Sequence, residues 1–246
     1  SAAEAARERS LPPGSKMGAG SARRETALRA ARAKRFVFHK QENTPQEKGE
    51  CERNMAETIL RMTGIQKYFP GVHALDNAQL EVREGEVMAL VGENGAGKST
   101  LLSLVCADNP QSYACDISLF GRKRGTGESI WEIKKHIGYV SPEMHRAYLK
   151  NLPAIEIVAS GLHDSIGLYR RPQPEQMDIC EWWMDVFGIA ALKDKAFLQL
   201  SSGEQRLALL ARAFVKDPEL LILDEPLHGL DTYNRRRVKK VIEAFC

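Results

Sequence analysis

The sequence has no apolar run long enough to cross a membrane, because a spanning helix needs about 18 or more consecutive apolar residues. Its five cysteines are scattered and include no C-x-x-C pair, which argues against a disulfide framework or a zinc site and suits a reducing compartment. A net charge of only +3 gives little support to nucleic-acid binding. These absences leave a globular protein whose membrane role, if it has one, goes through a partner.

Residues 1–54 have almost no large apolar side chains before Phe36 and are rich in Ala, Arg, Glu and Gly. Such a segment buries too little surface to offset the entropy that is lost on folding. We therefore expect residues 1–54 to be a disordered or vector-derived leader, and residues 55–246 to form the folded domain.

Strand and helix patterns alternate from residue 58 onward. Leu207, Leu210, Ala211 and Phe214 recur at helical spacing within an amphipathic segment at 203–216, and residues 153–187 are mainly helical in character. Strands are predicted at 58–62, 78–82, 86–91, 117–120, 137–140 and 220–223. This alternation predicts an α/β fold with parallel strands at its centre.

Residues 92–99 have the spacing G-x-x-x-x-G-K-S of a phosphate-binding loop and follow a predicted strand. The glycines allow backbone N–H groups to turn toward phosphates, and the helix that follows adds the positive end of its dipole. Lys98 would contact the β- and γ-phosphates, and the Ser99 hydroxyl would bind Mg²⁺. The expected binding residues here are Gly92, Asn94, Gly95, Gly97, Lys98, Ser99 and Thr100.

A second polar feature follows the apolar strand at 220–223, which ends in Asp224 and Glu225. Behind a phosphate loop, a carboxylate at a strand end is placed to hold Mg²⁺, which is the role expected of Asp224. Glu225 would orient or deprotonate an attacking water, as a general base.

Upstream of that strand, residues 200–204 read L-S-S-G-E, and residues 228–231 read H-G-L-D. Together with the phosphate loop and the Asp-Glu strand, they resemble the ATP-binding subunits of ABC transporters over roughly residues 58–246. The resemblance implies a P-loop NTPase fold of ABC type, with a mixed sheet, parallel core strands and a helical subdomain at about 143–203. It also implies ATP and Mg²⁺ as cofactors.

The resemblance further implies a head-to-tail pair of ATP-binding domains. Ser201 and Gly203 would contact the γ-phosphate held by the other copy, and Asp231 would lie in the loop between the copies. Adenine would stack on Phe69, with Tyr68 as second choice. Residues up to about 101 look most like ATPases of monosaccharide importers, whereas later residues look more like molybdate-import ATPases, so the chain is either composite or a diverged relative.

Three departures from the family pattern stand out. Pro142 occupies the position of a family glutamine and has no side-chain donor or acceptor, which leaves Glu143 either as a metal ligand or as a solvated surface residue. Ser202 and Glu204 replace a glycine and a glutamine, which weakens the contact between copies. No histidine follows Asp231, so we expect the final histidine-loop strand to be lacking and a sheet edge to be exposed.

The leading hypothesis is an ABC-type ATPase that powers solute transport through a transmembrane permease, cytoplasmic and peripheral to the inner (plasma) membrane. One alternative is a nucleotide-binding fragment without turnover. Another is an ABC ATPase that acts on nucleic acid or ribosomes, which the interleaved acidic and basic residues of the leader disfavour.

Overall fold

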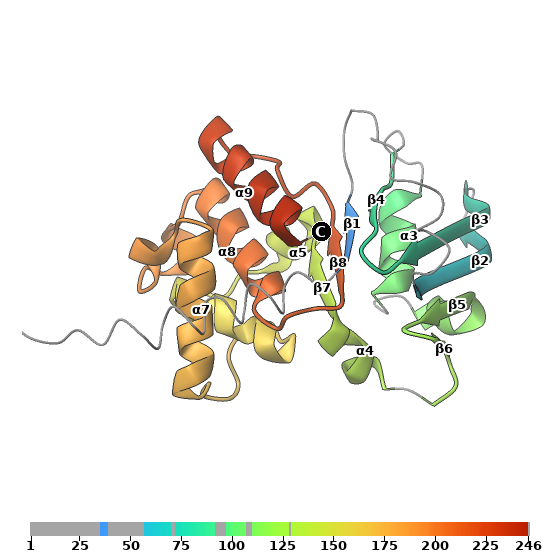
Figure 1. The fold of residues 1–246 in the computed structure, drawn as a ribbon, viewed down its shortest axis with the longest axis horizontal. Helices are drawn as coiled ribbons and strands as arrows, with labels where there is room; N and C mark the ends of the chain where they lie inside the picture. Colours follow the sequence, from blue (N-terminus) through green and yellow to red (C-terminus); the bar gives the residue numbers. More distant parts are fainter. Residues whose placement is uncertain are drawn as a thin grey trace, which may run out of the picture.

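The computed structural model describes residues 35–38, 57–69, 72–91, 97–106, 110–127 and 129–245. Figure 1 shows a strand-rich half and a helix-rich half on either side of a central sheet. The strands are β1 (Arg35–Phe38), β2 (Thr58–Phe69), β3 (Val72–Arg83), β4 (Val87–Ala89), β5 (Asp116–Leu119), β6 (Arg122–Lys123), β7 (Ile137–Val140) and β8 (Leu220–Leu223).

Helices occur in the segments where the sequence predicts them, which are the segment after the phosphate loop, residues 153–187 and residues 203–216, and also at other places in the described chain. The α-helices are α3 (Lys98–Val105), α4 (Ile130–His136), α5 (Pro142–Ala147), α6 (Ala154–Ala159), α7 (Pro174–Val186), α8 (Ser202–Phe214) and α9 (Thr232–Phe245). Short 3-10 helices are η1 (Pro110–Ala114), η2 (Ser160–His163), η3 (Ala190–Leu192) and η4 (Phe197–Gln199). No helix of the described ranges combines the length and the apolar character that a membrane crossing requires.

The central sheet has the strand order β4-β1-β8-β7, and all its pairings are parallel. All four residues of β8 are buried, which is typical of a parallel strand that is covered on both faces. The predicted parallel strands at the centre of the fold are therefore confirmed.

Strand β1 comes from the segment that the sequence assigned to an unstructured leader. It lies between β4 and β8, with Val37 opposite Met88 on one side and opposite Ile222 on the other. Strand β8 therefore has a neighbour on each side, β1 and β7, and the edges of this sheet are β4 and β7. Composition missed this strand because its partners lie far away in the sequence. Residues 1–34 and 39–56 lie outside the described ranges.

A separate antiparallel sheet has the order β3-β2-β5-β6. Its β2–β3 hairpin is longer than predicted, since the two strands pair from Thr58 opposite Arg83 to Phe69 opposite Val72. Parallel and antiparallel strands thus occupy two sheets rather than one mixed sheet. The buried apolar side chains of this sheet and of α3 pack together with residues of β7 and β8 in one core cluster.

The helix-rich half has its own core, which joins α7, α8 and α9 through aromatic rings. The ring centroids of Trp183 and Phe214 lie 4.9 Å apart, and those of Phe214 and Phe245 lie 5.1 Å apart. Aromatic packing of this kind contributes about 0.5–1.5 kcal/mol per pair beyond area burial. This cluster holds α8, which begins in the L-S-S-G-E motif, against the rest of the molecule.

Candidate functional site

The candidate site lies at the carboxyl ends of β4 and β8, where parallel α/β sheets usually bind ligands. Helix α3 follows β4 in the chain, and β4 belongs to the central sheet that contains β8 (Figure 1). Asp224 is the residue directly after β8. Three of the expected phosphate-binding residues, Gly92, Asn94 and Gly95, lie outside the described residues. The structure does describe the end of the phosphate loop, from Gly97 onward.

Gly97 caps α3 with a left-handed backbone, at φ 76°. A Cβ atom at this position would lie 2.4 Å from the carbonyl oxygen of Ala74, so both the conformation and the space require glycine. The carbonyl of Gly97 accepts a hydrogen bond from the N–H of Leu101 at 2.8 Å, which closes the first turn of the helix. Lys98, Ser99 and Thr100 occupy that turn, which contains no acidic residue. The positive end of α3 therefore meets no side-chain carboxylate from its own first turn.

Ser99 and Asp224 lie far apart in the sequence but close together in the structure. The Ser99 hydroxyl donates a hydrogen bond to Oδ2 of Asp224 at 3.4 Å. Asp224 is only 4% exposed, and its N–H donates to the carbonyl of Val140 at 2.8 Å, which fixes the end of β8 against β7. A hydroxyl and a carboxylate beside a helix N-terminus form a donor set that suits Mg²⁺ with nucleotide phosphates, because Mg²⁺ takes few protein ligands.

Glu225 has a left-handed backbone at φ 49°, which is uncommon for a residue with a side chain. Such strained positions cluster at functional sites. Its side chain is 46% exposed, and Oε2 lies 3.9 Å from Nδ1 of His228. The expected base therefore reaches solvent next to the buried carboxylate of Asp224.

Helix α5 begins at Pro142, and only Ser141 separates it from β7. The Ser141 hydroxyl caps this helix by accepting the N–H of Met144 at 3.0 Å, and proline suits the first helical turn. Glu143 pairs with Arg146 at 3.0 Å, and its side chain is 59% exposed. No group of three or more His, Cys, Asp or Glu side chains is placed to hold a metal ion within the described ranges. A metal-binding role of Glu143 stays a prediction.

Ser201 and Asp231, which are expected to act between two copies, are helix N-caps in the single chain. The Ser201 hydroxyl accepts the N–H of Glu204 at 3.3 Å, and Glu204 Oε2 accepts the N–H of Ser201 at 2.7 Å. That bond to the Ser201 backbone lowers the pKa of Glu204. Asp231 accepts from the backbone and side chain of Asn234 at 2.9 and 2.7 Å, and the backbone bond lowers its pKa.

For two further expected residues, the structure gives the position in the fold but does not test the predicted contact. Gly203 lies in the first turn of α8, where an added Cβ would lie 3.4 Å from the carbonyl oxygen of Gly229. Phe69 is the last residue of β2, but its side chain is outside the described part, so its stacking on adenine stays a prediction.

Sequence reasoning missed Arg206, which is buried next to the site. Its side chain is 3% exposed, and neither Nε nor Nη1 has a hydrogen-bond partner among the described residues. Burial lowers its pKa, and the carboxylates of Glu225, Asp224 and Glu143 oppose that shift. An arginine on the apolar side of an otherwise amphipathic helix was the available signal.

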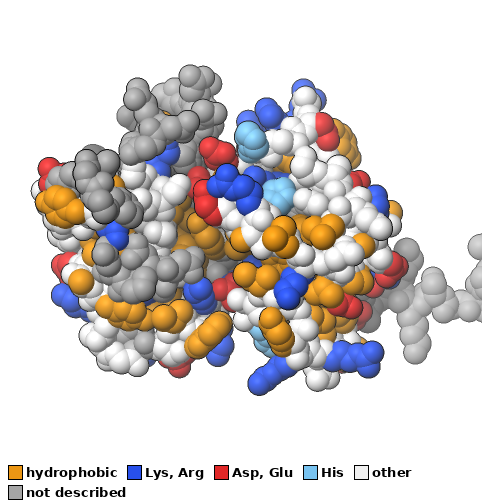
Figure 2. All heavy atoms as spheres, turned by 180° about the vertical axis from the view of Figure 1, so that it is seen from behind, with side chains coloured by type: hydrophobic (Ala, Val, Ile, Leu, Met, Phe, Trp, Pro, Cys, Tyr) orange, Lys and Arg blue, Asp and Glu red, His pale blue; other side chains and the backbone are white. Residues whose placement is uncertain are grey.

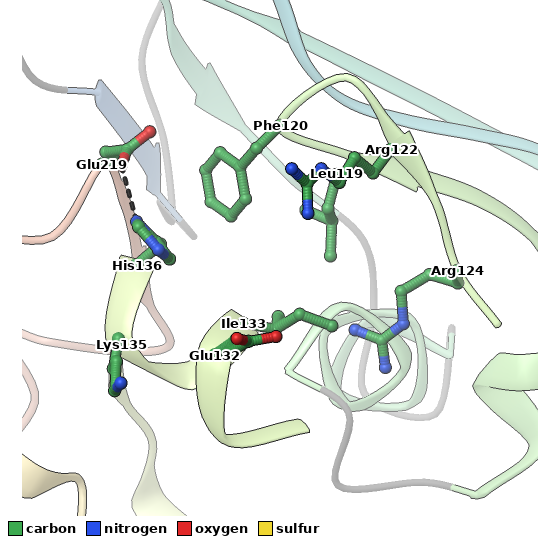
Figure 3. Close-up of a pocket in the computed structure, with 9 residues that line it drawn as sticks. All are labelled: Leu119, Phe120, Arg122, Arg124, Glu132, Ile133, Lys135, His136 and Glu219. Carbon is green, nitrogen blue, oxygen red and sulfur yellow. Dashed lines mark hydrogen bonds and ion pairs between the residues drawn. The ribbon is translucent and has the colours of Figure 1, made fainter. Parts of the chain in front are cut away.

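Other surface features lie away from the site. Figure 3 shows a groove at the amino ends of β7 and β8, where Nδ1 of His136 and Oε1 of Glu219 lie 2.6 Å apart. Leu119, Phe120 and Ile133 also line this groove, beside basic side chains. On the face shown in Figure 2, the coloured acidic, basic and apolar side chains are interspersed.

Comparison with known proteins gives the chain its family. The model of the ABC transporter family matches residues 75–228. ModF of Escherichia coli strain K12, an ABC transporter ATP-binding protein, is 50% identical over 172 residues, which are 70% of this chain and 35% of that protein. ZurA of Listeria innocua, a zinc uptake system ATP-binding protein, is 33% identical over 72% of this chain and 67% of its own length. The chain spans 35–39% of the first curated relatives that it matches.

Solved structures agree at the level of fold. The ADP form of MJ1267, an ATP-binding cassette of an ABC transporter, has a TM-score of 0.60 at 23% identity and covers 77% of each chain. A bacterial Atm1-family ABC exporter with ATP bound has a TM-score of 0.63 at 22% identity, over 76% of this chain and 32% of that one. The likeness of the first part to monosaccharide importers stays a prediction. The family model, the relatives and the fold show that this chain belongs to the ATP-binding domains of ABC transporters.

Proposed function

We propose that this chain binds ATP together with Mg²⁺ and hydrolyses it, as the ATPase module of a transport system with a membrane-embedded partner. The observation that carries the proposal is the contact between Ser99 and Asp224 at 3.4 Å. It joins the first turn of the phosphate-loop helix to the end of β8, which is the arrangement that Mg²⁺-dependent phosphoryl transfer requires.

Each residue has a distinct role in this proposal. The backbone N–H groups at the start of α3 and the ammonium group of Lys98 bind the phosphates. The Ser99 hydroxyl and the Asp224 carboxylate hold Mg²⁺, which when bound neutralises part of the phosphate charge. Glu225 orients water and accepts its proton, because a carboxylate at the exposed end of the strand is reachable from solvent.

Two copies would enclose ATP between them, with Ser201 and Asp231 facing the second copy. The transport role rests on relatives whose names place them in ABC transporters and, for ZurA, in zinc uptake. The solute itself is chosen by other subunits of such systems. A cytoplasmic position beside the membrane is part of the same proposal.

The first test is equilibrium binding of ATP to the full chain with and without Mg²⁺, with Lys98→Ala as the control. Tight binding that requires both Mg²⁺ and Lys98 supports the proposal. Phosphate release is then followed in the parent chain and in Glu225→Gln, where release is lost while ATP binding stays. Equal ATP binding by the parent and by Lys98→Ala would refute the assignment of the phosphate site.

A second candidate function is ATP binding without turnover. Pro142 favours it, because the side chain that begins α5 offers neither a donor nor an acceptor to an attacking water. Release of phosphate above the Lys98→Ala level decides between the two candidates.

A further inference from the structure

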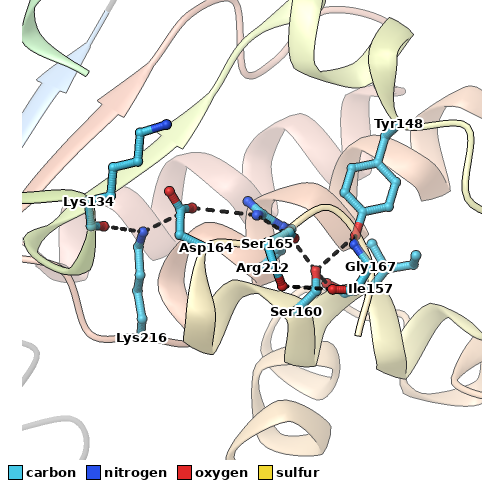
Figure 4. A network of polar contacts seen from close by, with 9 residues as sticks. All are labelled: Lys134, Tyr148, Ile157, Ser160, Asp164, Ser165, Gly167, Arg212 and Lys216. Atoms are coloured by element: carbon cyan, nitrogen blue, oxygen red, sulfur yellow. Dashed lines mark hydrogen bonds and ion pairs between the residues drawn. The ribbon is translucent and has the colours of Figure 1, made fainter. Parts of the chain in front are cut away.

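The buried guanidinium of Arg206 carries an inference that rests on the proposed function. Two arginines of helix α8 are buried to the same degree, Arg206 at 3% exposure and Arg212 at 4%. Arg212 has several partners: it donates through Nε to Ser160 Oγ at 3.2 Å, and through Nη2 to the carbonyl of Ser165 at 3.1 Å and to Asp164 at 3.5 Å (Figure 4). Arg206 has no such set, since its Nε and Nη1 atoms make no hydrogen bond within the described part of the chain.

The surroundings of Arg206 are fixed by its neighbours on the helix. Oε1 of Gln205 accepts a hydrogen bond from Nε2 of His145 at 2.9 Å, so this turn of α8 lies against α5. The preceding turn lies against the loop after Glu225, because a Cβ on Gly203 would lie 3.4 Å from the oxygen of Gly229. The part of α8 that bears the buried Arg206 is therefore packed against α5 and that loop.

Three acidic side chains of the site act on this buried cation without forming an ion pair with it in the described part of the chain. The carboxylates of Glu225, Asp224 and Glu143 each act electrostatically on its guanidinium. A buried charged donor without a hydrogen bond is costly, because it has lost its water and gained no partner. Such a cost is compatible with a functional role, because function often requires groups that lower stability.

We propose that Arg206 is a positioning residue, whose guanidinium holds the carboxylates of Asp224 and Glu225 in their working arrangement. Its free N–H groups are donors for these carboxylates as they take up Mg²⁺ and water. Because Arg206 belongs to α8, it also ties the helix of the L-S-S-G-E motif to the carboxylates of the same chain. Contact between that helix and a second copy would thereby influence the positions of the carboxylates at the end of β8.

The test compares Arg206→Met with Arg212→Met in the full chain. Urea unfolding without ligand, the Kd for Mg²⁺-ATP and the turnover rate are measured for each. Replacing an unsatisfied buried charge with an apolar side chain of similar length is often neutral or stabilising. Arg206→Met should therefore keep or raise the urea midpoint and keep the Kd within about threefold, while turnover falls by about a hundredfold, as small misplacements of catalytic groups do.

Arg212→Met should behave in the opposite way, with a clearly lower urea midpoint, because Asp164, Ser160 Oγ and the Ser165 carbonyl each lose a hydrogen bond from a buried guanidinium. The turnover rate of Arg206→Lys should be about tenfold higher than that of Arg206→Met, since lysine keeps the charge. A urea midpoint of Arg206→Met as low as that of Arg212→Met, or unchanged turnover, would overturn the inference. Absence of turnover in the parent overturns both the inference and the hydrolysis half of the proposed function, whereas absence of ATP binding overturns the whole.

Discussion

Replacing Asp164 by Asn removes a carboxylate that two buried cations share. Lys216 Nζ lies 3.2 Å and Arg212 Nη2 lies 3.5 Å from its Oδ1, and these cationic side chains are 6% and 4% exposed (Figure 4). Asp164 itself has a left-handed backbone at φ 49°, which asparagine tolerates well. The substitution therefore changes the charge and leaves the shape of the loop intact.

The expected loss follows from the burial of the three groups. Breaking a buried ion pair costs about 3–5 kcal/mol, because the remaining charge is left uncompensated. Asp164 is 21% exposed, Asn keeps an oxygen acceptor, and Lys216 also donates to the carbonyl of Lys134 at 2.6 Å. We therefore expect a loss of about 2–3 kcal/mol in the free energy of unfolding, below the full range.

The pH dependence of the loss has a defined sign. Burial already lowers the pKa of Lys216 from its ordinary value of 10.5, and Asp164 opposes that shift. In Asp164→Asn this pKa falls further, so between the lowered pKa and 10.5 the unfolded chain binds more protons than the folded one. Stability then rises with pH across that window, and the deficit of the variant shrinks there.

Urea unfolding at a series of pH values checks both points, with the exposed Asp178→Asn as the control for loss of one carboxylate. The slope of the free energy with urea should be unchanged, since the same surface is exposed on unfolding. A loss below about 0.5 kcal/mol, or one equal to that of the control, would show that Asp164 does not neutralise these cations.

Three further substitutions probe other parts of the fold. Gly161→Ala should cost about 3 kcal/mol or more in unfolding free energy, because its Cβ would lie 2.1 Å from the carbonyl oxygen of Arg212; an unchanged urea midpoint would contradict this packing. Glu204→Gln should remove about 0.5 kcal/mol of helix-end stabilisation that is present above the ordinary carboxyl pKa and lost as pH falls through the lowered one, so an identical acid-unfolding profile would count against the cap. Val37→Pro removes a backbone donor from the strand between β4 and β8, so urea midpoint and ATP affinity should both fall, as in a chain that starts at Met55; full ATP affinity in both would show that β1 is dispensable.

The elements that local patterns define were predictable from the sequence. Strands β7 and β8 occur at the predicted residues, and α8 covers 202–214 where the helical spacing predicted 203–216. Their apolar side chains recur at intervals that only one kind of element can bury, so the pattern identifies the element as a helix or a strand. The Ser99–Asp224 contact was predictable for a different reason, since the loop and the strand each carry a recognisable motif.

The position of β1 could not be predicted in the same way. A four-residue strand gives little periodicity, and its two neighbours begin at Val87 and Leu220. Which strands pair is decided by the register and the cover of the whole sheet, not by local composition. Arg206 was missed for a related reason, because its burial depends on where α5 and the loop after β8 are placed.

Ser201 and Asp231, two of the residues expected to act between copies, already have intramolecular partners. For Ser201, the chemistry of the hydroxyl decides whether both roles are possible. A serine hydroxyl has one donor and two acceptor positions. Ser201 uses an acceptor position for the N–H of Glu204, so its hydroxyl hydrogen remains able to donate to a phosphate oxygen. Capping and phosphate binding thus use different parts of the same group.

The carboxylate of Glu204 lies at the same positive helix end that a phosphate would approach, and like charges there oppose each other. Association of two copies through α8 should therefore be weaker than in a domain with a neutral glutamine at this position.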